Sequence, residues 1–150
     1  TVSANIAFGV DSKLINQTDV ERAGKIANLH KFVTDELPDE YQTTVGERGI
    51  RLSGGERQRI GIARALYHKP KVLILDEATS ALDNITEKAV MNSLHKMEKN
   101  ITIIMIAHRL STVKECDTIF LLDKGELRGQ GKFEELIKDS DYFRESANNL

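Results

Sequence analysis

Hydrophobic positions recur with a helical period in two segments of the first half of the chain. Apolar side chains repeat every three or four residues from Val20 to Phe32, and the overlapping Thr18-Asp19-Val20-Glu21 has the form of a capping box. This pattern predicts an amphipathic helix that begins near Thr18. A second helical segment runs from residue 54 to about residue 68, where a proline two residues later ends it. Leu37-Pro38-Asp39 is predicted to end the first helical region, and residues 43–50, which hold two glycines amid charged side chains, are predicted to form a loop.

Short apolar runs replace the helical period in the second half. Residues 72–75 are all apolar and favour β structure, as expected for a strand that is buried on both faces of a parallel sheet. Asn84 is predicted to cap a helix that extends to about residue 99, and residues 101–107 form the next predicted buried strand. The order strand, helix, strand is typical of a crossover between parallel strands.

Two further strands are predicted at residues 118–122 and 126–128 around a short turn, and a final helix begins near Phe133. The whole pattern indicates the α/β class, with a mostly parallel sheet whose ligands lie at the carboxyl ends of the strands. We expect residues 1–70 to form a mostly helical subdomain with its connections, and residues 71–150 to contribute to the sheet core.

Composition fits one α/β domain or a large part of one, since 40% of the 150 residues are hydrophobic and 29% are charged. A net charge of -2 with interspersed signs argues against a nucleic-acid partner. The single Cys116 excludes an internal disulfide, and we expect a buried thiol in a reducing compartment. No apolar stretch approaches the ~20 residues that cross a bilayer, so the chain by itself is expected to be soluble.

The first candidate for chemistry is Ser53-Gly54-Gly55-Glu56, at the start of the second predicted helix. Glycines at a helix N-terminus let backbone N–H groups approach an anion closely, and the helix dipole favours a phosphate there. The same residues also fit an ordinary capping box, S-x-x-E. Both interpretations remain open from these residues alone.

The second candidate is the acidic pair Asp76-Glu77, which follows the strand at residues 72–75. Asp76 could hold Mg²⁺ through water, and Glu77 could orient the water that attacks a γ-phosphate or accept its proton. His108 follows the next predicted strand and could donate a hydrogen bond to the transferring phosphoryl group. The alternatives are two solvated acids and a structural histidine.

Four motifs in order resemble those of the ATP-binding cassette (ABC) proteins. They are the signature Leu52-Ser53-Gly54-Gly55-Glu56 with the helix after it, a Walker B strand ending in Asp76-Glu77, a D-loop Ser80-Ala81-Leu82-Asp83, and a switch-histidine region Ile106-Ala107-His108-Arg109. The resemblance implies a P-loop NTPase-like fold of the ABC ATPase type. Residues 1–70 would then be the helical signature subdomain, and residues 71–150 the Walker B, D-loop and switch-histidine part of the ATPase core.

The resemblance also implies a head-to-tail dimer of two nucleotide-binding domains. Ser53, Gly54, Gly55 and Glu56 would contact ATP held by the partner domain, and Ser80 and Asp83 would take part in cofactor binding through the D-loop. Asp76, as the Mg²⁺ residue, and Glu77 and His108, as the catalytic residues, would serve ATP on their own domain. ATP and Mg²⁺ are thus the implied cofactors.

Part of such a domain is not in this sequence. A P-loop would read G-x-x-x-x-G-K followed by Ser or Thr, and neither Gly24-Lys25 nor Gly131-Lys132 fits. We therefore expect an incomplete domain whose Walker A, base-stacking aromatic residue and Q-loop glutamine precede Thr1. The isolated chain is expected to be inactive.

The loop Thr44-Val45-Gly46-Glu47-Arg48-Gly49 is similar to the X-loop of ABC exporters. The resemblance implies that Val45, Gly46, Glu47 and Arg48 touch the coupling helices of a transmembrane domain. The leading hypothesis is an exporter subunit with fused transmembrane and nucleotide-binding domains, whose ATPase part lies at the cytoplasmic face of a membrane. The alternatives are a soluble ABC-type ATPase that acts on DNA or ribosomes, and a binding or regulatory module without a P-loop.

Overall fold

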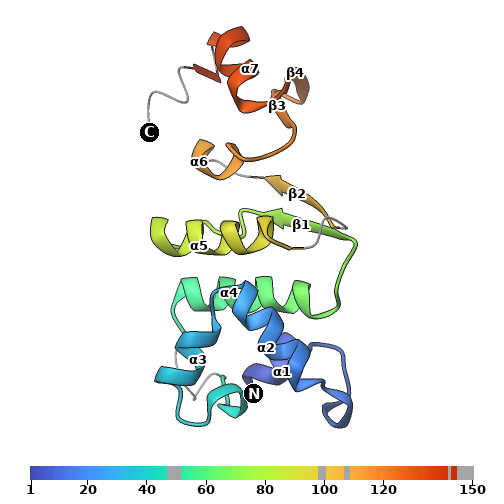
Figure 1. The fold of residues 1–150 in the computed structure, drawn as a ribbon, viewed down its shortest axis with the longest axis vertical. Coiled ribbons are helices and arrows are strands. Elements are labelled where there is room, and N and C mark those ends of the chain that lie inside the picture. The colour runs from blue at the N-terminus through green and yellow to red at the C-terminus, as the bar shows by residue number, and fades with distance from the viewer. Residues whose placement is uncertain (47–51, 98–100, 107–108, 142, 145–150) are drawn as a thin grey trace. The chain divides into compact units, whose positions relative to one another are not determined.

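The computed structural model describes residues 1–46, 52–97, 101–106, 109–141 and 143–144. The chain packs as two compact units, Thr1–Ile104 and Met105–Leu150 (Figure 1). Packing thus divides the chain at a different place from the boundary between residues 70 and 71 that the sequence motifs predict. That boundary separates motifs rather than compact units, and it stays a prediction.

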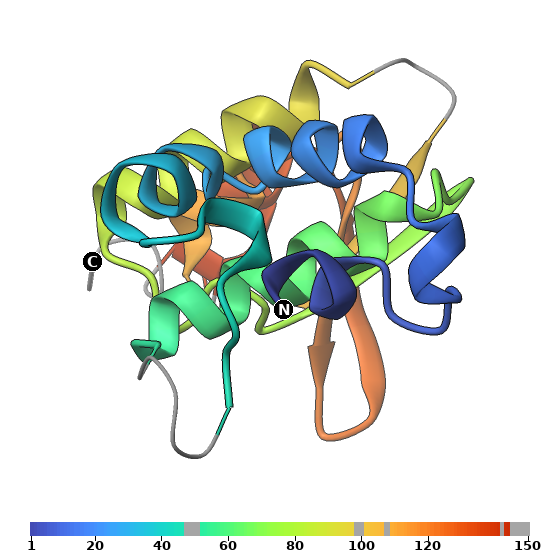
Figure 2. The same cartoon turned by 90° about the horizontal axis from the view of Figure 1, so that it is seen from below.

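The first unit is mostly helical. Its helices in chain order are α1 (Val2–Ile6), the 3-10 turn η1 (Ser12–Leu14), α2 (Gln17–Ile26), α3 (His30–Glu36), the 3-10 turn η2 (Glu40–Gln42), α4 (Gly54–Tyr67) and α5 (Asn84–His95). Helices α1 and α2 pack on α4 (Figures 1 and 2). The predicted helix at residues 54–68 is confirmed as α4. The core between these helices is made of fully or almost fully buried side chains, among them Val2, Ile6, Val20, Ala23, Ile62, Ala63 and Leu66.

The helix predicted from Thr18 to Phe32 is two helices, and that prediction was wrong in two respects. Asn16 is the N-cap of α2, because its side chain accepts a hydrogen bond from the backbone N–H of Asp19 at 3.2 Å. The helix then ends at Ile26, since Asn28 takes a left-handed conformation with φ of 52°. The backbone N–H of Leu29 bonds the Gly24 carbonyl at 2.8 Å, and Leu29 becomes fully buried before α3 begins.

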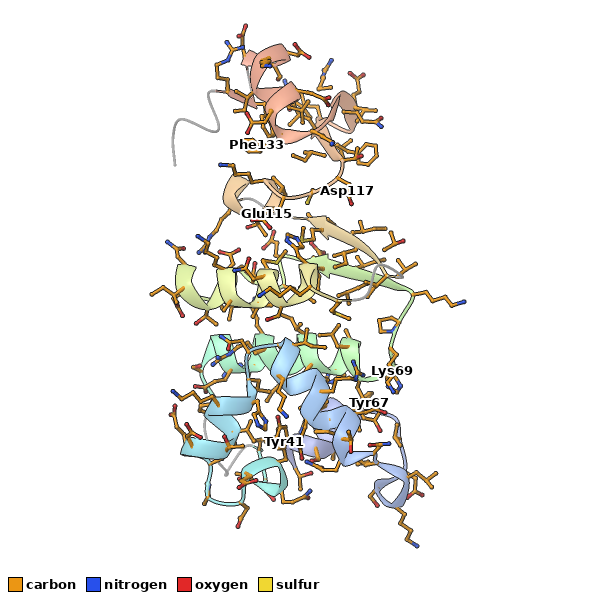
Figure 3. The ribbon with its side chains drawn as sticks, in the orientation of Figure 1. Tyr41, Tyr67, Lys69, Glu115, Asp117 and Phe133 are labelled. Atoms are coloured by element: carbon orange, nitrogen blue, oxygen red, sulfur yellow. The ribbon has the colours of Figure 1, made fainter. Side chains whose placement is uncertain are left out.

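Gly24 allows the side chain of Tyr41, which lies in η2, to approach α2 closely. A Cβ atom at Gly24 would collide with the hydroxyl oxygen of Tyr41, a buried side chain that lies among the helices of this unit (Figure 3). The Tyr41 hydroxyl lies 3.0 Å from Nδ1 of His30. Burial, with help from the charges of Glu21 and Glu40, raises the pKa of Tyr41 to about 12. The hydroxyl therefore stays protonated and joins α3 to η2.

Strand β1 (Val72–Asp76) pairs with β2 (Thr102–Ile106), and α5 connects them. The backbone N–H of Thr102 bonds the carbonyl of Lys71 at 2.8 Å at the start of this pair. Burial alternates along β1: Leu73 and Leu75 are buried, whereas Val72 is 52% exposed and Ile74 is 64% exposed. The prediction that this strand is buried on both faces was therefore wrong for the described residues, whose side chains cover only one face.

The second unit contains α6 (Leu110–Val113), β3 (Ile119–Asp123), β4 (Glu126–Gly131) and α7 (Phe133–Asp139). The two predicted strands and the final helix are confirmed. Strands β3 and β4 form an antiparallel hairpin in which Asp123 faces Glu126. Lys124 and Gly125 between them have φ of 50° and 81°, as a two-residue hairpin turn requires.

A small core of Ile119, Leu136 and Phe143 holds the second unit together, and the ring centroids of Phe133 and Phe143 lie 5.5 Å apart. Cys116 packs against this core and is half-buried rather than fully buried. Burial, and then the charge of Asp117, raises the pKa of its thiol. Within the described ranges, no helix has the length and apolar character needed to cross a membrane.

Candidate functional site

The start of α4 combines a helix cap with two glycines. The Ser53 hydroxyl accepts a hydrogen bond from the backbone N–H of Glu56 at 3.2 Å, and the Glu56 carboxylate accepts one from the backbone N–H of Ser53 at 2.6 Å. The capping box is therefore present. It is compatible with a phosphate site, because a hydroxyl that accepts one bond can still donate its own hydrogen. The first N–H groups of a helix, here those of Gly54 and Gly55, also have no acceptor within the helix and suit an anion.

The two glycines lie against Ala81 and Leu82. A Cβ atom on Gly55 would stand 3.3 Å from the Ala81 carbonyl oxygen and 3.3 Å from Cδ2 of Leu82. A Cβ atom on Gly54 would stand 3.4 Å from the Cβ of Ala81, which is an ordinary contact. A side chain at position 55 would thus press on the neighbouring turn, whereas position 54 has room for a methyl group.

The acidic pair lies where β1 ends. Asp76 is the last residue of the strand, and Glu77 follows in a left-handed conformation with φ of 47°; both residues are exposed. The carbonyl of Glu77 accepts a hydrogen bond from the backbone N–H of Ser80 at 3.0 Å, and the carbonyl of Thr79 accepts one from Leu82 at 3.0 Å. The chain therefore turns sharply after the two acids. The exposed Asp76 carboxylate at a strand end suits Mg²⁺, which keeps several water and phosphate ligands.

Gln58 joins this turn to α4. Its side-chain amide nitrogen donates to the carbonyl of Glu77 at 3.2 Å and lies 2.9 Å from the Ser80 hydroxyl, and its amide oxygen accepts from the backbone N–H of Ala81 at 2.8 Å. Gln58 was not among the predicted site residues. No pattern distinguishes it, because Gln58 stands in a run of polar side chains in the first turns of the helix.

Asp83 is the N-cap of α5, so the prediction that Asn84 caps this helix was wrong. The Asp83 carboxylate accepts hydrogen bonds from the backbone N–H groups of Ile85 and Thr86, both at 3.0 Å. Hydrogen bonds from Thr86, of which the backbone one has the largest effect, hold the pKa of the Asp83 carboxyl below its usual value. The charged carboxylate therefore fixes the end of the segment 80–83.

Three of the predicted site segments lie in the first unit, and residues 54 and 55 of the first segment contact residues 81 and 82, in the turn that follows the acidic pair at 76 and 77. Some of the other predicted residues are not placed. His108, Glu47 and Arg48 lie outside the described residues. Val45 is half-buried and Gly46 is exposed in the loop that follows η2. The roles of all these residues remain predictions.

Comparison with known proteins identifies relatives of this chain. The family model described as "ABC transporter" matches residues 5–80. A leukotoxin export ATP-binding protein of Aggregatibacter actinomycetemcomitans is 56% identical over 117 residues, which are 78% of this chain and 16% of that protein. An ATP-dependent lipid A-core flippase of Saccharophagus degradans is 48% identical over 143 residues, which are 95% of this chain and 24% of that protein.

A mouse protein, ATP-binding cassette sub-family B member 5, is 45% identical over 145 residues, which are 96% of this chain and 12% of that protein. Among solved structures, a bacterial Atm1-family ABC exporter with ATP bound is similar with a TM-score of 0.87 and 42% identity, over 99% of this chain and 26% of that one. The chain thus spans about a quarter or less of the length of these relatives. It belongs to the ABC transporter family.

Proposed function

We propose that this chain is part of the ATP-hydrolysing nucleotide-binding domain of an ABC exporter, which couples ATP binding and hydrolysis to the export of a substrate across a membrane. The observation that carries the proposal is the contact of the glycines at the start of α4 with the turn that follows Asp76 and Glu77. The helix start, which would bind an anion, is thereby joined to the segment that follows the strand-end acidic pair. Relatives named as export proteins and a flippase support the direction of transport.

The acidic pair would act on ATP bound to its own domain. Asp76 would hold Mg²⁺ through water; when bound, Mg²⁺ neutralises charge on the phosphates. Glu77 would orient the attacking water or accept its proton, and its exposed position after a sharp turn leaves its carboxylate accessible to such a water. His108 would donate a hydrogen bond to the transferring phosphoryl group.

The start of α4 would act on ATP bound to a partner domain. There the Ser53 hydroxyl and the backbone N–H groups of Gly54 and Gly55 would bind the γ-phosphate, with Glu56 holding Ser53 through the capping box. Ser80 and Asp83 would take part through the D-loop. Because the Asp83 carboxylate already caps α5, we assign it to shaping that loop.

The implied partners follow from this arrangement. A second nucleotide-binding domain would pair head to tail with this one, and a transmembrane domain would contact Val45, Gly46, Glu47 and Arg48 through its coupling helices. The assembly would place this chain at the cytoplasmic face of a membrane, and the chain itself would be soluble. Nucleic acid is not among the proposed partners, in keeping with the net charge of -2.

The 150-residue chain alone is expected to bind MgATP only with a dissociation constant in the millimolar range or weaker, because a P-loop would supply most of the phosphate contacts. Isothermal titration calorimetry on the isolated chain measures this. The matched control is the same sequence in the intact subunit that contains the P-loop, which should bind in the micromolar range. Micromolar binding by the chain alone would contradict the expectation that the P-loop supplies most of the phosphate contacts. Absence of binding by the intact subunit would contradict the proposed function.

A further inference from the structure

The side chain of Gln58 connects two elements that the proposed function assigns to different ATP molecules. Gln58 lies in α4, two residues after Glu56, and its amide reaches three groups of the turn after β1: the Glu77 carbonyl, the Ser80 hydroxyl and the Ala81 backbone N–H. The first of these belongs to the residue expected to activate water. The other two belong to the D-loop.

We propose that Gln58 is a positioning residue for ATP hydrolysis, which fixes the turn carrying Glu77 to the start of the signature helix. The inference rests on the proposed function and deepens it. Gln58 contacts neither nucleotide in this account. It acts through the backbone of Glu77 and through residues 80 and 81.

The turn that carries Glu77 needs such support. Glu77 has φ of 47°, a conformation that is unfavourable for a residue with a side chain and persists where surrounding contacts fix it. Its carbonyl accepts two hydrogen bonds, from the Ser80 N–H at 3.0 Å and from Gln58 at 3.2 Å. Fixing this carbonyl fixes the orientation of the adjoining peptide group, and therefore the direction in which the Glu77 side chain leaves the backbone.

The neighbouring polar side chains of α4 bond elsewhere. The Glu56 carboxylate accepts from Ser53, the Arg57 guanidinium donates to the Leu52 carbonyl at 2.5 Å, and the Arg59 guanidinium donates to the Asn28 carbonyl at 2.8 Å. Gln58 thus has a task that these neighbours do not share. A glutamine suits it, because one planar amide can donate and accept at the same time.

Gln58 therefore links the helix start that would bind the partner domain's ATP to the turn whose Glu77 would act on the domain's own ATP. The start of α4 touches Ala81 and Leu82 directly at Gly55, and Gln58 ties the same turn to the next part of the helix. A shift of the signature helix on engaging the partner's ATP would therefore move the peptide group of Glu77 with it. This turn and α4 lie in the same compact unit.

The test uses the intact exporter subunit and measures steady-state ATP hydrolysis. Gln58→Ala is expected to lower kcat by about 10- to 100-fold, the scale expected when a catalytic group is misplaced by about 1 Å, while KM for ATP stays within about threefold. Gln58→Glu keeps the length and can still accept from Ala81, but it cannot donate to the Glu77 carbonyl, so it should also lose kcat. If both variants turn over ATP at the wild-type rate, the inference is wrong.

A double-mutant cycle separates positioning from a general loss of stability. Because Gln58 and Ser80 are hydrogen-bonding partners, the variant carrying both Gln58→Ala and Ser80→Ala should lose less kcat than the product of the two single losses. Losses that multiply would overturn the shared role. Gln130→Ala, the same substitution at an exposed glutamine of β4, is the control and should keep the wild-type rate.

Two reference proteins distinguish the failure of this inference from failure of the proposed function. If the wild-type subunit does not hydrolyse ATP, or if Glu77→Gln leaves its rate unchanged, the proposed function fails. If the wild type is active, Glu77→Gln is inactive and Gln58→Ala is fully active, only the role of Gln58 fails. Should Gln58→Ala not fold, Gln58→Glu decides the question through its kcat and its KM.

Discussion

Replacing Glu77 by glutamine is expected to lower ATP turnover of the intact exporter by about 10²- to 10⁴-fold, the usual contribution of a positioned general base. ATP binding should remain nearly unchanged, because the amide has the same shape and Glu77 is not expected to hold the nucleotide. The exposed position of Glu77 at the end of β1 also means that the substitution disturbs no buried core. Steady-state hydrolysis and equilibrium binding of labelled ATP measure the two effects separately.

A matched control for this variant is Glu134→Gln, at an exposed acidic residue in the first turn of α7. It removes one negative charge in the same way and should leave turnover within about twofold of the wild type, since exposed single substitutions away from a site usually have small effects. Turnover of the Glu77→Gln protein at the level of this control would refute the catalytic assignment of Glu77.

The second large effect is expected at the start of α4. In a Glu77→Gln background, which should hold ATP without hydrolysing it, Gly54→Ala is expected to weaken ATP-dependent dimerisation by tenfold or more, because a methyl group hinders approach of the γ-phosphate to the backbone. A lost hydrogen bond to a charged group is worth about 1.5–3 kcal/mol, which corresponds to at least this factor. Analytical ultracentrifugation with and without MgATP measures the dimer.

Position 54 is suited to this test because the free domain should tolerate the change. A Cβ atom there meets Ala81 at an ordinary contact distance of 3.4 Å, whereas one at Gly55 would press on the Ala81 carbonyl at 3.3 Å. The control is Gly61→Ala in the same helix, where a Cβ atom meets no heavy atom within 4 Å. If Gly54→Ala dimerises with ATP as strongly as Gly61→Ala does, Gly54 has no role across the interface.

The helical and strand patterns located most elements, and the errors have physical causes. The period of apolar residues continues through Asn28, so it could not reveal that this residue turns into the left-handed region and divides α2 from α3. Asp83 and Asn84 are both good caps, and only the observed bonds to Ile85 and Thr86 decide between them. The apolar run of β1 indicated two buried faces, yet Val72 and Ile74 are exposed in the described part of the chain.

Those parts of the candidate site were predictable from the sequence in which residues of the right chemical type stand at the start of a predicted helix or at the end of a predicted strand. A serine with two glycines at a helix start, and two acids at a strand end, each point to phosphate chemistry, and the structure brings both to one turn. Their separate roles came from the family resemblance rather than from spacing. Gln58 was not predictable, because its importance depends on a tertiary contact between residues about 20 positions apart.

This chain is proposed to supply parts of two different ATP sites. A structure of the intact Glu77→Gln exporter with MgATP bound would test this division. We expect the γ-phosphate of each ATP to lie within hydrogen-bond distance of Ser53 and of the backbone N–H groups of Gly54 and Gly55 from one domain, and beside residue 77 of the other domain. Two results would contradict this division of roles. One is a structure in which Ser53 and residue 77 of the same domain contact the same γ-phosphate, and the other is a closed dimer in which Ser53 contacts no phosphate.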